Sequence, residues 1–291
     1  MAIPQSKVFF PTGLQELFSS WYSNPDAVLW AGGAEHIRNQ SGQNPKLPRN
    51  IISLDKMEEL HKISRTERHL EIGCMVKLSK IINMGKIVPE VLIRCLENIA
   101  SPQLRSQATI GGNICNPSIR LDISAPMIAL DAQYELRSAQ STRWVSASRF
   151  SSQPGPLSLG RQECLTRIRV PLEPWTFTWY RKFNFSLSSK PGGCILLILR
   201  NQKDILTDIR VLYSSQAILR EKNAESMLMG KHLPLDHRDA SAFVDAWKNY
   251  LSSMPEGENT EFPGGYGNLS PGLIKTQILR FIESTLLHIS D

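Results

Sequence analysis

Two pairs of adjacent glycines, Gly32-Gly33 and Gly111-Gly112, stand about 80 residues apart in this chain. The first pair follows a short apolar run, residues 27–31, which predicts a buried strand that ends at the glycines. Because glycine has no Cβ, backbone N–H groups at such a turn can converge on an anion. A glycine pair after a strand is more often an ordinary turn, so this segment alone favours phosphate binding only weakly.

The second glycine pair lies in a polar stretch, residues 101–132, that is poor material for a core. The small donors Asn113, Asn116 and Ser118 and the carboxylate of Asp122 follow the glycines closely. This composition suits a loop that binds phosphate and ribose, since glycine permits close approach and Asn and Ser donate hydrogen bonds without bulk. A capped surface loop is the alternative interpretation of the same stretch.

No other residue set points to catalysis or to a metal. The sequence shows no Ser/His/Asp or Cys/His arrangement, and its six histidines form no HxxxH pair. His232 and His237 lie in KHLPLDHRD, which is more typical of a turn than of a metal site. The five cysteines form no CxxC pair and are typical of reduced, mostly buried thiols. We therefore predict neither a catalytic residue nor a metal ligand.

Composition places the chain among folded proteins. It has 291 residues, of which 41% are apolar and 21% charged, enough to bury a core. The net charge of +6 is spread without a basic run, which argues against nucleic-acid binding. No apolar run approaches the roughly 20 residues of a membrane span, and the first residues lack a signal-peptide pattern. We expect a cytoplasmic protein without a membrane span.

Hydrophobic periodicity predicts a mixture of strands and helices, which favours an α+β or α/β architecture. The expected strands cover residues 27–31, 50–54, 69–73, 193–199 and 205–213. The expected helices cover residues 14–22, 77–84, 89–100, 217–228, 240–251 and 273–287.

The ordered series of segments resembles the FAD-binding (medium) subunit of the molybdenum hydroxylase family, which includes the carbon monoxide dehydrogenase medium subunit and the xanthine dehydrogenase FAD-binding subunit. Residues 31–36 (AGGAEH) are similar to the family's AGGT(D/E)L. Residues 100–113 (ASPQLRSQATIGGN) are similar to ASPQIRNxATIGGN. Residues 163–171 (ECLTRIRVP) resemble GELLTxIRIP, and residues 180–182 (YRK) resemble F-x-K.

The resemblance implies a fold and a domain organisation. The expected fold is α+β: a two-part FAD-binding domain of the vanillyl-alcohol-oxidase/PCMH type, then a smaller α+β C-terminal domain with an antiparallel sheet and helices. The FAD-binding domain is expected to cover residues 1–171, with subdomains of about 1–55 and 56–171. The C-terminal domain is expected to cover residues 172–291.

The resemblance also implies FAD as the cofactor and a set of residues that contact it. The first glycine segment would wrap the pyrophosphate, the second would form the opposite phosphate and ribose wall, and three further residues would border the ring system or the adenine. The implied contacts are Val28, Leu29, Trp30, Ala31, Gly32, Gly33, Ala34, Glu35, Thr109, Gly112, Asn113, Ser118 and Asp122, with Ile99, Leu165 and Lys182 as the bordering residues.

In function, the resemblance implies an electron-transfer subunit of a xanthine dehydrogenase-like complex. It would pass electrons from iron–sulfur clusters to NAD+ or another acceptor, in a hetero-oligomer with an iron–sulfur subunit and a molybdopterin subunit. Three departures from the family pattern are Ala34 in place of Thr, His36 in place of Leu, and the absence of Arg after Lys182. Ala34, Leu121 and the absence of Arg after Lys182 motivate the alternative, a non-catalytic assembly subunit that has kept the fold but lost FAD. A flavin oxidase of the vanillyl-alcohol type is a weaker match, because that group usually has a longer chain.

Overall fold

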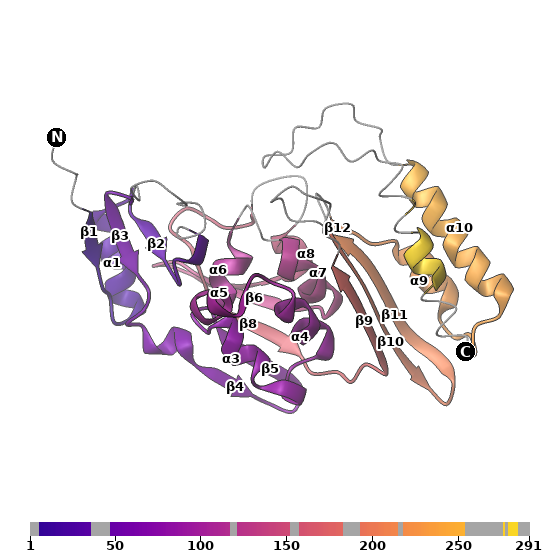
Figure 1. The fold of residues 1–291 in the computed structure, drawn as a ribbon. Helices are drawn as coiled ribbons and strands as arrows, with labels where there is room; N and C mark the ends of the chain where they lie inside the picture. The colour runs from indigo at the N-terminus through magenta and orange to yellow at the C-terminus, as the bar shows by residue number, and fades with distance from the viewer. Residues whose placement is uncertain are drawn as a thin grey trace. The chain divides into compact units, whose positions relative to one another are not determined.

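The computed structural model describes residues 6–35, 47–116, 121–151, 157–182, 193–214, 218–253, 276 and 279–284. The chain divides into two compact units (Figure 1), unit 1 over Met1–Glu173 and unit 2 over Pro174–Asp291. Both glycine pairs belong to unit 1. No helix among the described residues is long and apolar enough to cross a membrane.

Unit 1 begins with a small parallel sheet in the order β1-β3-β2. Helix α1 packs beside it and buries Leu17 and Phe18, in keeping with the predicted helical stripe. The elements are β1 (Lys7–Phe9), α1 (Leu14–Ser23), β2 (Val28–Trp30) and β3 (Asn50–Ser53). The strand predicted before the first glycine pair is therefore present as β2, and it places Gly32-Gly33 just beyond its carboxyl end.

The larger sheet of unit 1 is antiparallel, in the order β4-β5-β8-β6-β7. Its strands are β4 (Ile63–Arg65), β5 (His69–Gly73), β6 (Gln133–Arg137), β7 (Thr142–Ser146) and β8 (Cys164–Pro171). Side chains of β8 alternate, with Ile168 and Val170 fully buried on one face. On the other face Arg167 and Arg169 both donate to the carboxylate of Glu71 on β5. One face of this sheet is thus apolar and the other polar.

Short helices pack against this sheet and against one another in unit 1 (Figure 1). They are η1 (Glu58–His61), α3 (Leu78–Ile82), η2 (Gly85–Ile87), α4 (Glu90–Glu97), α5 (Pro102–Gln107), α6 (Ile110–Ile114), α7 (Leu121–Ala129) and α8 (Ala147–Phe150). Helix α6 contacts β8, and α8 contacts β6 and β7. The rings of Tyr134 on β6 and Phe150 on α8 meet edge to face at 5.1 Å, which fixes α8 on the sheet.

The prediction of a loop around the second glycine pair is wrong, because residues 102–107 and 110–114 are helical as α5 and α6. Side-chain caps start both helices. The Ser101 hydroxyl accepts from the Leu104 N–H, and the Thr109 hydroxyl accepts from the Gly112 N–H at 3.1 Å. Two short capped helices in succession look like a polar loop in a hydropathy pattern, because neither is long enough to show a 3.6-residue period.

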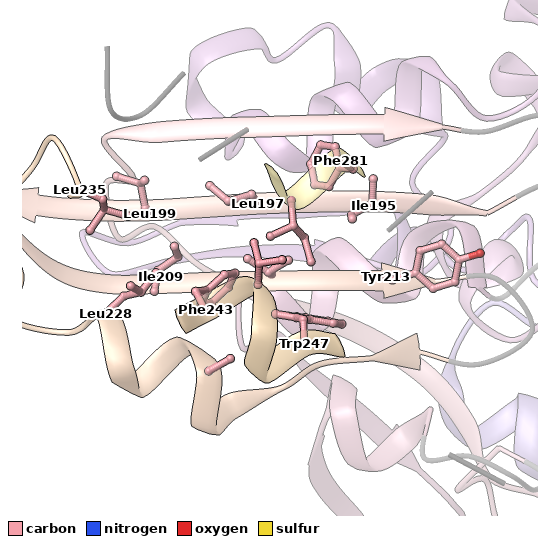
Figure 2. Close-up of a cluster of buried hydrophobic side chains, with 14 of the residues drawn as sticks. Ile195, Leu197, Leu199, Ile209, Tyr213, Leu228, Leu235, Phe243, Trp247 and Phe281 are labelled. Carbon is pink, nitrogen blue, oxygen red and sulfur yellow. The ribbon is translucent and has the colours of Figure 1, made fainter. Parts of the chain in front are cut away.

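Unit 2 is an antiparallel sheet in the order β12-β11-β10-β9 with helices on one face. Its elements are β9 (Phe177–Lys182), β10 (Cys194–Gln202), β11 (Ile205–Ser214), β12 (Ile218–Leu219), α9 (Lys222–Leu228) and α10 (His237–Ser253). Figure 2 shows Phe243 and Trp247 of α10 beside apolar side chains of β10 and β11, and both are fully buried. A helix predicted over residues 217–228 is wrong at its start, because residues 218–219 pair with β11 as β12.

The α+β fold expected from the sequence is confirmed by these layers: a small parallel sheet, a five-stranded antiparallel sheet with helices, and a second antiparallel sheet with helices. Residues 276 and 279–284, the described part of the last predicted helix, are helical.

An ion pair fastens the start of β8 to β7. Glu163, with only 7% of its side chain exposed, accepts both Nε and Nη2 of Arg143 at 2.7 Å and the Gly160 N–H at 2.7 Å. Hydrogen bonds from Arg143 and Gly160 favour the carboxylate, so the pKa of Glu163 lies below its ordinary value despite partial burial. A carboxyl whose pKa is lowered on folding stabilises the fold above its ordinary pKa and loses that contribution as the pH falls through the folded pKa.

We expect Glu163→Gln to lower the free energy of unfolding at pH 7 by about 1–2 kcal/mol, since Gln cannot accept all three donors. The difference from the unmodified chain should shrink as the pH falls below about 4.5, the ordinary pKa of the carboxyl. Urea unfolding at a series of pH values measures this. Glu90→Gln, which breaks an exposed pair with Arg94, is the control and should cost under about 0.5 kcal/mol. If the free energy of unfolding fell with pH in the same way for the Glu163 variant and the unmodified chain, the lowered pKa of Glu163 would be contradicted.

Candidate functional site

The first glycine pair forms a tight turn between a strand and a helical segment. The Trp30 carbonyl at the end of β2 accepts from the Leu54 N–H at 3.0 Å, which anchors the strand end. Gly33 has φ +68°, a left-handed conformation that favours glycine, and a Cβ there would press on the Trp30 ring at 3.0 Å. The chain is already helical at Ala34 and Glu35. The backbone at this turn is therefore bare and followed by helical N–H groups.

The two glycines of the second pair differ in their surroundings. Gly111 is buried, and a Cβ there would lie 2.6 Å from Cys74 Cβ and 2.8 Å from the Cys74 carbonyl oxygen. Gly112 is exposed, and a Cβ there would meet Thr109 Oγ1 at 2.9 Å and Ala31 Cβ at 3.6 Å. Gly111 thus lets α6 pack tightly in the protein, whereas Gly112 presents a bare backbone outwards.

The structure brings the two glycine segments together. A Cβ on Gly32 would collide with the main-chain carbonyl oxygen of Gln107 at the end of α5. Beside this contact, Ala31 faces Gly112. We call the surface formed by residues 31–34 and 107–113 the glycine cradle. Gly32 is partly exposed and Gly112 exposed, so a bound molecule could reach the backbone that side chains would otherwise cover.

One buried polar atom at the glycine cradle lacks a partner. Asn113 is only 4% exposed, and among the described residues its Oδ1 has no hydrogen bond. A buried acceptor left without a donor costs on the order of 1–3 kcal/mol, so a hydroxyl or N–H donor from a bound molecule would stabilise this site. Thr109 is 1% exposed, and its hydroxyl already accepts from the Gly112 N–H. That N–H is therefore engaged within the helix.

The sequence assigned Ile99 and Leu165 to the border of the same site. Both are buried, at 4% and 5% exposure. The turn that carries Ile99 is held by Arg105, whose Nη1 donates to the carbonyls of Glu97, Ile99 and Ala100 at 2.8–3.0 Å. Ile99 is thus held by a side chain of α5, the helix that leads into the glycine cradle.

For three predicted contacts the described structure gives no side-chain position relative to the glycine cradle. Lys182 ends β9 opposite Cys194 and belongs to unit 2. Ser118 lies outside the described residues. Asp122 falls in the first turn of α7, and only its backbone is described.

Two residues at the glycine cradle carried no signal that the sequence patterns could reveal. Cys74 packs against Gly111, and Lys77 donates from Nζ to the Gln107 carbonyl at 3.0 Å. The first contact joins residues 37 positions apart and the second joins residues 30 positions apart, so no local motif encodes either of them. They follow from antiparallel pairing of residues 76–78 with residues 108–110.

The thiols behind α6 are not reactive groups. Burial raises the pKa of Cys74 well above its ordinary value and the pKa of Cys164 to about 12. Both thiols stay protonated at neutral pH, where a thiol is a poor nucleophile and metal ligand. Among the described residues, no group of His, Cys, Asp and Glu could hold a metal ion. The chemistry available at the glycine cradle is therefore binding through the backbone, Asn113 and the nearby ammonium of Lys77.

Solved structures show the same fold. Quinoline 2-oxidoreductase from Pseudomonas putida 86 superposes over 100% of this chain and 98% of its own, with a TM-score of 0.79 and 19% identity. Carbon monoxide dehydrogenase from Hydrogenophaga pseudoflava superposes over 100% of this chain and 98% of its own, with a TM-score of 0.78 and 23% identity.

Sequence relatives agree. The xanthine dehydrogenase FAD-binding subunit of Escherichia coli O157:H7 is 30% identical over 167 residues, which is 56% of this chain and 57% of that subunit. The chain thus matches a little over half the length of this relative. The nicotinate dehydrogenase FAD-subunit of Eubacterium barkeri is 30% identical over 246 residues, 80% of this chain and 82% of that subunit.

Residues 4–173, nearly all of unit 1, match the family described as the FAD binding domain in molybdopterin dehydrogenase. This confirms the resemblance drawn from the glycine segments and the expectation of FAD as the cofactor. The chain belongs to this family of FAD-binding domains.

Proposed function

We propose that the glycine cradle binds the pyrophosphate of FAD. The N–H groups of Gly32 and Gly33, at a turn that leads into helical backbone, would donate to the phosphate oxygens. The Oδ1 of Asn113 would accept from a hydroxyl of the ribityl or ribose group, which would satisfy its unpaired buried oxygen. Ile99 and Leu165 would contribute apolar surface beside the bound cofactor.

One observation carries this proposal. Two glycine segments about 80 residues apart meet where Gly32 lies against the Gln107 carbonyl and Gly112 faces Ala31. Packing alone explains Gly32 and Gly111, because side chains there would collide with backbone or with Cys74. It explains Gly112 less fully, because a Cβ there would closely meet only the Thr109 hydroxyl, at 2.9 Å, and the residue itself is exposed. A bare exposed backbone next to a helical N–H turn suits a phosphate-bearing molecule.

FAD, when bound, supplies the redox chemistry, because its isoalloxazine ring accepts and donates electrons. The chain's own residues would bind the phosphates, orient the ring and limit its contact with water. We propose that no acid or base of this chain takes part in the redox step.

We further propose that the chain is an electron-transfer subunit of a molybdenum hydroxylase complex. It would take electrons from an iron–sulfur subunit, whose partner molybdopterin subunit oxidises the substrate, and deliver them to NAD+ or another acceptor. The matches to relatives named FAD-binding subunits support this role. A subunit that has kept the fold but lost FAD is the alternative, suggested by Ala34 where the family pattern has Thr.

The first test compares adjacent glycines. The unmodified chain, titrated with FAD, should bind one FAD per chain and show the two visible bands of oxidised flavin. Gly112→Ala places a methyl group in the cradle and should raise the FAD Kd at least about tenfold, a loss of about 1.4 kcal/mol. Its apo free energy of unfolding should stay within about 1 kcal/mol, because the better helix propensity of Ala offsets part of the cost of its 2.9 Å approach to the Thr109 hydroxyl.

Gly111→Ala is the matched control. Its methyl group would collide with Cys74, so the apo free energy of unfolding should fall by about 1–3 kcal/mol. Quenching of flavin fluorescence reports binding, and urea unfolding reports stability. If Gly112→Ala bound FAD as tightly as the unmodified chain, the proposal that the FAD pyrophosphate binds in the glycine cradle would be contradicted. Failure of the unmodified chain to bind FAD would favour the assembly alternative.

The partner proposal predicts the composition of the native complex. A tagged chain purified from its native host should bring down one small subunit with iron and acid-labile sulfide and one large subunit with molybdenum. Mass spectrometry and metal analysis identify both. Recovery of the tagged chain by itself at full yield, with FAD bound, would contradict the complex while leaving the cofactor site intact.

A further inference from the structure

The side chain of Lys77 starts directly beside the cap of α6. The Leu78 N–H donates to the Ala108 carbonyl at 3.0 Å, and the Ile110 N–H donates to the Val76 carbonyl at 2.9 Å. These two bonds flank an antiparallel bridge between Lys77 and Thr109. In a bridge of this pattern the two residues form a non-hydrogen-bonded pair, with close Cα atoms and side chains on the same face. Lys77 therefore projects from the same face as the Thr109 hydroxyl that caps Gly112.

The ammonium of Lys77 ends at the contact between the two glycine segments. Its Nζ donates to the Gln107 carbonyl at 3.0 Å, and this is the oxygen against which Gly32 packs. An ammonium has three donors and this bond uses one. Two donors are left at the junction of the glycine cradle.

The charge of Lys77 is not balanced by a carboxylate in the part of the chain that the structure describes, where its side chain bonds only the Gln107 carbonyl. A main-chain carbonyl satisfies a hydrogen bond but does not neutralise a full positive charge. Lys77 is half-buried, so its field is screened less than that of an exposed lysine. An unneutralised cation beside bare glycine backbone favours an anionic group at the same place.

We propose that Lys77 supplies the counter-charge for the FAD pyrophosphate in the glycine cradle, a role that rests on the proposed function of the cradle. The two N–H groups that remain on Nζ bind the phosphate oxygens directly, while the third keeps α5 against the Gly32 turn. Lys77 is thus a cofactor-binding residue and takes no part in the electron transfer itself.

The test measures FAD affinity at two ionic strengths. Lys77→Met keeps the apolar stem and removes the charge, and at about 0.05 M NaCl it should raise the FAD Kd about tenfold. Lys77→Arg keeps the charge and should stay within about threefold of the unmodified chain. The gap between Met and Lys should narrow at about 0.5 M NaCl, because salt screens a charge interaction. A purely structural loss at the Gln107 carbonyl would not depend on salt.

Lys80→Met is the matched control. Lys80 lies on α3 and lines a hollow of about 550 Å3 together with Glu59, Glu71 and Arg167. Its loss should leave the FAD Kd unchanged. Lys77→Gln provides a second neutral variant should Lys77→Met unfold, and it should show the same salt-dependent loss.

Two results distinguish a failure of the role proposed for Lys77 from a failure of FAD binding in the glycine cradle. If the unmodified chain binds FAD and both neutral variants bind it equally tightly, or lose affinity equally at both salt concentrations, Lys77 is not the counter-charge and the cradle assignment stands. If the unmodified chain does not bind FAD, the proposed function fails and the role of Lys77 fails with it. Fluorescence titration of the apo protein gives all of these values without an activity assay.

Discussion

The close approach of Gly32 to the main chain of Gln107 is the constraint on which the rest of unit 1 depends. It is possible only because Gly32 has no side chain, and it joins the end of β2 in the small parallel sheet to the end of α5, which packs against α3. The pairing of residues 76–78 with residues 108–110 holds α6 in place from the other side. The Gly111 contact with Cys74 completes this arrangement. Together these contacts fix two distant segments within one site.

The same constraint separates structural glycines from binding glycines. Gly32 and Gly111 face protein atoms that no side chain could displace cheaply, so packing is a sufficient reason for both. Gly112 faces outwards, and its amide is capped by Thr109. Its role in binding is therefore to leave space, whereas donation to phosphate falls to the turn at Gly32 and Gly33. Lys77, which has no carboxylate partner among the described residues, donates to the Gln107 carbonyl against which Gly32 packs.

The glycine pairs could be recognised from the sequence because residue type alone carries the signal. The strand before Gly32 could be predicted because five apolar residues precede that glycine. The helices α5 and α6 could not be predicted from the sequence. Each is short and begins at a Ser or Thr cap, and neither shows a helical period of apolar residues. The role of Lys77 has no signal in the sequence, because its partner, the Gln107 carbonyl, lies 30 residues away and every residue has a carbonyl.

Unit 2 shows the same division between local and distant information. The alternation in β11 predicts a strand with one apolar face, and α10 covers that face with Phe243 and Trp247 (Figure 2). The two-residue strand β12 was predicted as helix because its sequence fits either structure, and only its pairing with Tyr213 and Ser214 decides. Lys182 was assigned to the cofactor by resemblance, and because it belongs to unit 2, the geometry within unit 1 does not test that assignment.

Hydrogen–deuterium exchange of the chain with and without FAD tests most directly whether the two glycine segments bind one cofactor. Peptides that cover residues 28–35 and residues 107–116 are compared under identical conditions. The glycine cradle predicts slower exchange in both segments at once, in proportion to FAD occupancy, with little change in the peptides of α10. Slower exchange in only one of the two segments, or protection confined to other regions, would contradict a shared phosphate site.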